Sequence, residues 1–388
     1  MKTLLTHLRH FFVVLLLLAV PAIALALAYG VDLDYGDDMR AWKVGDEGPH
    51  VFAAADGWVV NHIRGSRQQG FVLEQQRHPT GQGFETSVHF PLDDSSFSVR
   101  VEPGIAAPAA VHEDGQPILA VSDVEGNYRT FRDFLIQQRV MDAALEWTFG
   151  RGHLVLVGDF VDRGASTTQL LWLIYKLEQA ARAKGGQVHF ILGNHEIKNL
   201  QGNFQAAHKK YLGVAGILER QQQELTGAES FLGRWLASKN TIEKINGHLF
   251  VHGGLHPGLA EAGFDLDQMN RSVREHYRRP YYPRQQRLAE DLLINTQTGL
   301  AWYRGYFEDG VSQAQMEATL RHFDAKAVVV GHTPVWRVQT RFDGRLLAIG
   351  VKHPLDYRGS LPPRRSEGLL IVGGQYSRAL HDGSTVPL

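Results

Sequence analysis

The sequence predicts an α/β domain preceded by a small all-β domain, and three observations lead to this fold class. An apolar run dominates the first 28 residues, short β runs separated by turn residues follow, and from about residue 116 apolar strands alternate with amphipathic helices. Nearly continuous apolar strands that alternate with helices are typical of a sheet covered on both faces. We therefore expect residues 1–28 to form a signal peptide or N-terminal anchor, 29–115 a β-rich accessory domain and 116–388 the main domain.

The first segment has the pattern of an export signal. Lys2 and Arg9 precede the uncharged run "FFVVLLLLAVPAIALALA", and the small residues at its end suit a cleavage site. The run is close to the lower length limit of a membrane-spanning helix, so an uncleaved anchor is the alternative. Both interpretations predict an exported protein that is periplasmic or secreted, or that is associated with the inner membrane through this segment.

The composition excludes several classes of protein. Lys and Arg number 40 against 41 Asp and Glu, so the chain lacks the basic field that nucleic-acid binding usually needs, and no nucleic-acid partner is expected. There is no cysteine, which leaves His, Asn, Asp and Glu as the candidate metal ligands. Six of the 19 histidines have no motif around them and are expected to be surface or half-buried side chains: His78, His153, His189, His276, His322 and His381.

The accessory domain is predicted from four β runs, "GWVVNHIR", "GFVLEQQRH", "FETSVHF" and "SFSVRVE". The turn-forming stretches "PTGQG" and "DDSS" lie between them, which predicts a small antiparallel sheet or sandwich. The next stretch, "EPGIAAPAAVHEDGQ", has no periodicity and contains Pro and Gly. It is expected to be a linker or a long edge connection.

The main domain is predicted from five apolar runs, "PILAVSD", "HLVLVGD", "QVHFILGN", "HLFVHGG" and "KAVVVGH". Helical stretches such as "TFRDFLIQQRV" and "TTQLLWLIYKLEQAARAK" lie between them, and "RLLAIGV" and "GLLIVGGQYSRAL" add strands near the end. Residues 197–246 have helical periodicity and are expected to form a solvated helical cover or a cap over a substrate cleft. The basic and aromatic stretch 275–287 is expected to contact phosphotyrosine or a nucleotide, or to be a plain loop.

Each of the five apolar runs ends at a residue of a metal-binding type. These residues are Asp123 with Glu125, Asp159, Asn194 with His195, His252 and His332. Ligands of open α/β sheets bind at the carboxyl ends of strands, so these side chains are expected to converge. Asp123 and Glu125 occupy alternate positions and would face the same side, which is costly unless a cation lies between them.

The motifs "SDVEGN", "GDFVDRG", "GNHE", "HGG" and "GHT" follow one another in this order. In this order they resemble those of the calcineurin-like metallophosphoesterases, in particular the phosphoprotein phosphatases and the bacterial Shewanella-like phosphatases; "WYRGY" at 302–306 is similar to the bacterial branch. The resemblance covers about residue 118 to the end. It implies the metallophosphoesterase fold, a central β-sandwich flanked by helices.

The resemblance also implies roles for individual residues. Asp123 would bind the first metal, Asp159 would bridge both metals, and Asn194, His252 and His332 would complete the second site. His195 would protonate the leaving group and be held by Asp162, while Arg163 and Arg304, with Asn194, would hold the phosphate. The cofactors implied are two divalent ions, with Mn favoured over Fe, Zn, Mg or Ca. Such a pair clamps the attacking and leaving oxygens and yields a metal-bound hydroxide near neutral pH.

The first motif departs from the family pattern. Glu125 stands where the family has His, and Ser122 replaces the usual first Gly. The first site would then consist of the carboxylates of Asp123, Glu125 and Asp159. Oxygen ligands favour Mn, Mg or Ca, so a reduced preference for Zn is expected.

The function implied is the hydrolysis of phosphomonoesters, on phosphorylated proteins (Ser/Thr or Tyr) or on small phosphoesters. One alternative is a hydrolase of dinucleoside polyphosphates or other phosphoanhydrides. A second is a degenerate protein that binds phosphorylated ligands without turnover, or an envelope-attachment protein whose β domain is the active part. The motifs do not separate these alternatives.

Overall fold

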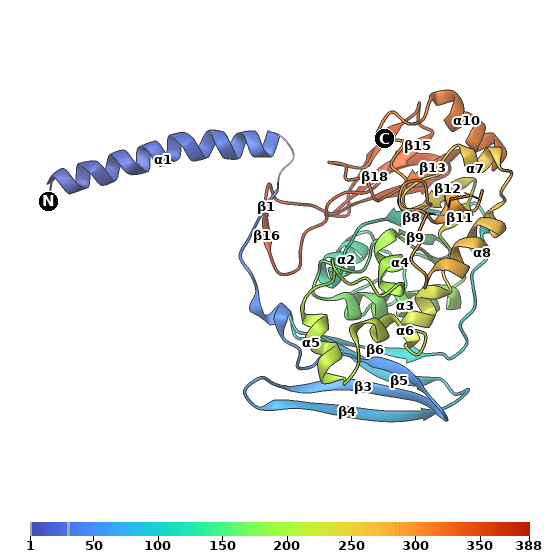
Figure 1. Cartoon of the computed structure of the whole chain (residues 1–388), viewed down its shortest axis with the longest axis horizontal. Helices are drawn as coiled ribbons and strands as arrows, with labels where there is room; N and C mark the ends of the chain where they lie inside the picture. Colours follow the sequence, from blue (N-terminus) through green and yellow to red (C-terminus); the bar gives the residue numbers. More distant parts are fainter. Residues whose placement is uncertain (1, 29–31, 284, 287) are drawn as a thin grey trace.

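The structure, a computed structural model, describes residues 2–28, 32–283, 285–286 and 288–388 (Figure 1). The N-terminal helix α1 (Lys2–Ala28) extends away from the rest of the chain, and its apolar window Thr3–Pro21 has none of its residues buried. It is long and apolar enough to cross a membrane. The expected domain boundary at residue 29, and residues 284 and 287 of the basic stretch, lie outside the described residues.

Two six-stranded sheets form the centre of the molecule. The first has the order β10 (Gln187–Ile191), β9 (His153–Val157), β8 (Ile118–Val121), β17 (Glu367–Val372), β18 (Gln375–Leu380) and β19 (Thr385–Pro387). The second has the order β14 (Gln339–Arg341), β15 (Leu346–Ala348), β13 (Ala327–Val330), β12 (His248–Val251), β11 (Ile242–Ile245) and β7 (Val111–His112). In the first sheet β8 is parallel to β9, and β9 to β10.

The alternation of side chains along the strands explains why the two sheets pack together. Ile118 and Ala120 of β8 share a buried apolar cluster with Phe250 and Val329 of the second sheet. The intervening residues of the same strands belong to the larger core, which also contains the helices. Because alternate residues face opposite sides of a sheet, each sheet covers the other with one face and the helices with the other. The expected sandwich flanked by helices is confirmed.

Helices cover the outer faces of both sheets (Figure 1). They are α2 (Tyr128–Gln137), α3 (Thr167–Ala183), α4 (Asn194–Leu200), α6 (Phe231–Ala237), α7 (Gly258–Glu261), α8 (Leu266–His276), α9 (Asp291–Ile294) and α10 (Gln313–His322), with 3-10 turns at Met39–Trp42 and Gln222–Thr226. Helix α5 (Lys210–Ile217) packs instead on the N-terminal strands, where Tyr211 and Val214 share a cluster with Phe52 and Ile63. Helix α3 buries Leu170, Trp172 and Leu173 completely, as expected for a helix between two layers. The two helices predicted from sequence around 130–140 and 167–184 are therefore present as α2 and α3.

The N-terminal strands lie beneath α3, α5 and α6 in the view of Figure 1. They are β2 (His50–Ala54), β3 (Gly57–Ser66) and β4 (Gly70–Pro79) in one antiparallel sheet, and β5 (Phe84–Phe90) and β6 (Ser95–Val101) in another; β1 (Leu33–Tyr35) pairs instead with β16 (Gly359–Leu361). Val60 and Val88 belong to the same hydrophobic core as Trp172 of α3. The strands therefore pack directly on the main body, and their independence as a domain stays a prediction.

One part of the helical cover was predicted wrongly. Within residues 197–246, expected to be helical, Ile242–Ile245 forms strand β11. It pairs antiparallel with β12 and parallel with β7, which lies in the stretch expected to be a linker. Four residues are too few for a helix and a strand to be told apart by periodicity. The Asn246-Gly247 pair between β11 and β12 is a sequence signal for a hairpin, whereas β7 is remote in sequence and its pairing has no such signal.

Candidate active site

The polar residues that follow the strands of the sandwich gather around one cavity of about 590 Å³. Its walls include the following predicted site residues: Asp123, Glu125, Asp159, Arg163, Asn194, His195, Arg304 and His332. Strands β8 and β9 end at Val121 and Val157, two residues before Asp123 and Asp159. Parallel strands bring their carboxyl ends to the same edge, so the expected convergence of these residues is present.

The backbone of the site has an unusual conformation. Six site residues other than glycine have positive φ angles: Asp123 at 57°, Glu125 at 53°, Asp159 at 60°, Asp162 at 70°, Arg163 at 53° and His332 at 59°. The left-handed region is unfavourable for a residue with a Cβ and persists only where the surrounding structure fixes it. Such strain concentrated around one cavity is typical of a functional site.

Four side chains place donor atoms close together at the bottom of the cavity. One ligand atom each from Asp159, His252 and His332 lies within 4.8 Å of the others, and all three residues are buried. The terminal amide atom of Asn194 lies 3.2 Å from His252 Nε2, 2.9 Å from His332 Nδ1 and 3.3 Å from Asp159 Oδ2. When that atom is the amide oxygen, it faces only lone pairs, and a cation among the four groups satisfies them all. The donor set therefore fits a divalent metal.

The electrostatics of these groups are those of a cation site. Burial raises the pKa of Asp159, but the positive charge of His252, whose Nε2 lies 3.0 Å from Asp159 Oδ2, lowers it well below its usual value. Burial lowers the pKa of His252, and the charge of Asp159 outweighs burial and raises it to about 9. Burial and the charge of His252 together lower the pKa of His332 to about 3. A positive charge, either a proton or a metal, therefore belongs beside Asp159.

Asp123 lies at the edge of this cluster and is held by three neighbours. The backbone N–H of His332 donates to Asp123 Oδ2 at 3.1 Å, and the backbone N–H of Asp123 donates to the carbonyl of Gly158 at 3.0 Å. The hydroxyl of Ser122, the residue that replaces the usual glycine, also contacts Asp123 Oδ2. Glycine at 331 permits this approach, because a Cβ there would lie 2.7 Å from that same oxygen. Burial raises the pKa of Asp123, so this carboxylate too requires a compensating cation.

The Glu125 carboxylate contacts the guanidinium of Arg163. The side chain of Glu125 is 20% exposed and that of Arg163 is 53% exposed, so the pair lies at the cavity mouth. The backbone N–H of Glu125 donates to the carbonyl of Asp159 at 2.9 Å, and this hydrogen bond fixes the turn after β8. Glu125 thus shares the cavity with Asp123 and Asp159, and its expected role as a metal ligand stays a prediction.

His195 is oriented by a carboxylate, as expected. Its Nδ1 lies 2.7 Å from Asp162 Oδ2, and the other oxygen of Asp162 accepts a hydrogen bond from Asn199 Nδ2 at 2.8 Å. The His195 Nε2 atom lies 3.5 Å from Nη2 of Arg163 and 3.9 Å from Asp159 Oδ2. Because a carboxylate can only accept, Nδ1 of His195 donates the hydrogen in the bond to Asp162. The other ring nitrogen, Nε2, is then free to exchange a proton with a substrate.

Glu196 is a further residue of the site, and no role for it is predicted from the sequence. One of its carboxylate oxygens accepts hydrogen bonds from the backbone N–H groups of Asp159 and Gly193, and the other accepts from those of Phe160 and Val161. The side chain is completely buried. It therefore holds the strained loop after β9 against the start of α4. The position of Glu196 in the motif "GNHE" indicates from sequence that it belongs to the site. The groups that donate hydrogen bonds to its buried carboxylate cannot be predicted from the sequence.

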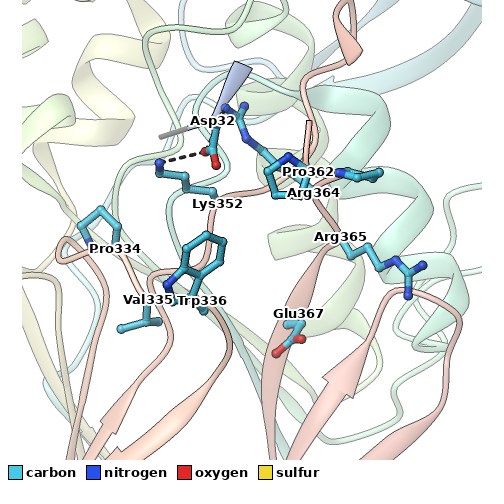
Figure 2. A pocket seen from close by; sticks show the side chains of 10 residues that line it. Asp32, Pro334, Val335, Trp336, Lys352, Pro362, Arg364, Arg365 and Glu367 are labelled. Carbon is cyan, nitrogen blue, oxygen red and sulfur yellow. Dashed lines mark hydrogen bonds and ion pairs between the residues drawn. The ribbon is translucent and has the colours of Figure 1, made fainter. Parts of the chain in front are cut away.

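A second cavity, of about 380 Å³, adjoins the first (Figure 2). The two share Pro334, Lys352 and Arg364. Figure 2 shows Trp336 standing in this cavity, where it is 73% exposed. Lys352 Nζ lies 2.8 Å from Asp32 Oδ2, whereas Arg365 makes no ion pair within the part of the chain that the structure describes. The second cavity thus offers an exposed aromatic ring and a free cation beside the first.

The profile of the calcineurin-like phosphoesterases matches residues 116–336, more than half of the chain. The chain belongs to the calcineurin-like phosphoesterase family. The matched region contains Asp123, Asp159, His252 and His332, which lie together in the structure. Divalent metal ions are therefore the cofactors of this fold, and the chain is a phosphoesterase of the metallophosphoesterase class.

Relatives within the family are known. The chain is 26% identical over 231 residues to Shewanella-like protein phosphatase 2 of Arabidopsis thaliana and 25% identical over 227 residues to Shewanella-like protein phosphatase 1 of Plasmodium berghei. These matches cover 49% and 56% of this phosphoesterase, and 57% and 60% of the relatives. The crystal structure of a cold-active protein-tyrosine phosphatase from a psychrophilic Shewanella species superposes with a TM-score of 0.74 at 27% identity, covering 88% of this chain and 99% of that one.

Proposed function

We propose that this phosphoesterase is an exported, metal-dependent phosphomonoesterase that acts on phosphorylated proteins. The observation that carries the proposal is the shared cavity. It combines the metal-type donors of Asp159 and Asn194, the Asp162-oriented ring of His195 and the guanidinium groups of Arg163 and Arg304. A donor cluster for divalent ions next to an oriented imidazole and two arginines is suited to phosphate esters.

Two groups of residues would hold the metal pair. Asp123, Glu125 and Asp159 would bind the first ion; Asp159, Asn194, His252 and His332 would bind the second. When bound, the ions would neutralise charge on the phosphoryl oxygens and lower the pKa of a bound water molecule. The oxygen-rich first site favours Mn or Mg over Zn.

The residues of the chain supply the remaining steps. Arg163 and Arg304 would bind phosphoryl oxygens, because a guanidinium matches the geometry of phosphate with two parallel hydrogen bonds. Arg304 Nη1 lies 3.3 Å from the hydroxyl of Thr333, which directs it toward the cavity. His195 would donate its Nε2 proton to the oxygen of the leaving group, while Asp162 holds the ring in place through Nδ1.

A protein substrate is favoured by the second cavity. Trp336 and Arg365 lie outside the phosphate pocket but adjoin it through Pro334, Lys352 and Arg364. A small phosphoester would leave these residues unused, whereas a phosphorylated peptide would extend across them. Exposed aromatic and Arg side chains are the types enriched at protein-binding surfaces.

An exported location is supported by α1. The helix begins at Lys2 and contains Arg9, and none of the residues of its apolar window Thr3–Pro21 is buried. A cleaved signal and an uncleaved anchor both place the catalytic body outside the cytoplasm. Mass analysis of the mature N-terminus in the host membrane and soluble fractions separates these two forms.

The test is a substrate panel with the full chain in mild detergent, supplied with Mn. Phosphotyrosine and phosphoserine peptides, p-nitrophenyl phosphate and a dinucleoside tetraphosphate are compared by kcat/KM, with Asp159→Asn as the inactive control. Preference for the phosphopeptides supports the proposal. Preference for the dinucleotide overturns it in favour of an anhydride hydrolase, and binding of phosphopeptides without turnover overturns it in favour of a non-catalytic role.

A further inference from the structure

A second group of potential metal ligands lies away from the catalytic cavity. It consists of His112 on β7, His189 on β10 and Glu243 on β11, whose ligand atoms all lie within 4.8 Å of one another. His189 and Glu243 are 4% and 0% exposed, so the expectation of a surface or half-buried position for His189 is wrong. The same correction applies to its neighbour His153, which is fully buried.

The position of this cluster relates the two sheets. His153 is the first residue of β9, whose other end leads to Asp159, so the cluster is at the opposite end of that strand from the catalytic residues. Strands β9 and β10 belong to one sheet, and β11 and β7 to the other. A cation held here would join both sheets and the short strand β7 of the connecting segment.

The histidines form a chain of contacts that ends in a carboxylate at each side. Asp114 Oδ1 lies 2.8 Å from His153 Nε2, and His153 Nδ1 lies 2.9 Å from His189 Nε2. The chain ends at Glu243, whose Oε2 lies 2.7 Å from Nδ1 of His189. The second oxygen of Glu243 accepts a hydrogen bond from Asn240 Nδ2 at 3.0 Å.

The number of hydrogens in this chain is informative. Three contacts require three hydrogens, whereas two neutral imidazoles carry only two and ionised carboxylates carry none. If His153 donates to Asp114 and His189 donates to His153, the lone pair on Nδ1 of His189 faces the Glu243 carboxylate with nothing between them. A cation at that contact supplies the missing positive partner and leaves the hydrogen bonds from His153 to Asp114 and from His189 to His153 in place.

We propose that His112, His189 and Glu243 form a divalent-cation site, best suited to Zn²⁺, that is distinct from the catalytic centre. Two imidazoles and one carboxylate, with no cysteine in the chain, are a donor set typical of zinc. The link from His189 through His153 to Asp114 is the kind of outer contact that fixes the ring of a metal-binding histidine. Water completes the coordination from the side of His112, whose side chain is 16% exposed.

The distances require only small movements. Ligand atoms of a tetrahedral zinc site are roughly 3.3 Å apart, given bonds of about 2.0–2.1 Å. The 2.7 Å between His189 Nδ1 and Glu243 Oε2 would widen, and the 3.9 Å between His112 Nε2 and the same oxygen would shorten. His112 ends a two-residue strand, and its Nε2 would exchange its contact with the carbonyl of Ala109, 3.1 Å away, for the metal.

In the experiment, the full chain in mild detergent is stripped of metal with a chelator and then supplied with zinc. The zinc bound per chain is measured. Asp159→Asn serves as the background, since it weakens the catalytic centre and leaves the proposed site intact. In this background, Glu243→Gln and His112→Gln are compared with His381→Gln, a control at an exposed histidine outside the cluster. The His112 variant keeps the test valid if removal of the buried Glu243 prevents folding.

The proposal predicts that Glu243→Gln and His112→Gln each bind about one zinc equivalent less than the background and the His381 control. They also lose most of the rise in melting temperature that zinc produces, because a ligand that binds only the folded state stabilises it. In the wild-type catalytic background the same two changes leave Mn-supported hydrolysis within about twofold. Equal zinc content in all variants, or binding that requires millimolar zinc, overturns the proposal. The contact between His189 and Glu243 would then hold a proton instead of a metal ion.

Discussion

The carboxylate of Glu125 lies against the guanidinium of Arg163 at the mouth of the catalytic cavity. The first residue occupies the position where the family motif has histidine, and the second is a proposed ligand of the substrate phosphate. The ion pair between Glu125 and Arg163 therefore competes with the expected binding of a metal by Glu125 and with the proposed binding of phosphate by Arg163. An anion paired with Arg163 reduces the positive charge available for a phosphate.

Replacing Glu125 with His tests this relationship. We expect Glu125→His to lower the KM for p-nitrophenyl phosphate by about fivefold, because Arg163 loses its internal anion. The imidazole also raises activation by Zn relative to Mn, since it is a better zinc ligand than a carboxylate. Steady-state kinetics with each metal measure both effects; an unchanged KM and an unchanged ratio of Zn to Mn activity contradict this interpretation.

The proposed acid role of His195 predicts a dependence on the leaving group. His195→Gln should lower kcat for a phosphoserine peptide by about a hundredfold or more, because an alkoxide needs a proton to leave. For p-nitrophenyl phosphate, whose leaving group is stable as an anion, the loss is smaller. Asp162→Asn, which keeps the ring but weakens its orientation, should fall between the wild type and His195→Gln. An equal loss on both substrates would assign His195 to metal or phosphate binding instead.

The second cavity predicts a difference between peptide and small substrates. Trp336→Ala and Arg365→Glu should raise the KM for an acidic phosphopeptide by about five- to tenfold, through lost contact area and reversed charge. Neither change should alter hydrolysis of p-nitrophenyl phosphate, which does not reach this cavity. Arg321→Glu on α10 is the matched charge control. A parallel change with both substrates would place these residues in the phosphate pocket.

Metal binding should depend on pH through His252. The charge of Asp159 raises the pKa of His252 to about 9, so below that pH the ring carries a proton that must leave before it accepts a metal. The apparent Mn affinity of the stripped protein should therefore fall by about tenfold for each unit of decreasing pH. Calorimetric titration in buffers of different ionisation heats measures the affinity and the released proton. An affinity independent of pH would show that His252 is not a ligand.

Much of the catalytic cavity was predictable because its residues follow apolar strands in short motifs. Asp159, His252 and His332 each come directly after a buried run, and parallel strands bring such positions together. The orientation of His195 by Asp162 also follows from the motif resemblance. The sandwich follows from alternating apolar residues, which only a second sheet or a layer of helices can cover.

The remaining features depend on pairings between remote segments. The pairing of β11 with β7 joins segments that are far apart in the sequence, and no local pattern indicates it. The hairpin of β11 with β12 is different, because the Asn246-Gly247 pair between the two strands is a local signal for it. The contact of Glu125 with Arg163 and the burial of His189 beside Glu243 likewise depend on loop conformation and sheet order. Sequence patterns indicate which residue types are available, but the fold decides which of them meet.

Hydrolysis of p-nitrophenyl phosphate by the full chain, after removal of metal with a chelator, tests whether this phosphoesterase depends on divalent metal ions. The stripped protein is titrated separately with Mn, Mg, Zn and Ca, and circular dichroism verifies that it stays folded. We predict that removal of metal abolishes activity and that Mn restores it best, whereas Asp159→Asn remains inactive at every metal concentration. Activity that survives stripping, or a folded protein that no metal activates on this ester or on phosphopeptides, would contradict it.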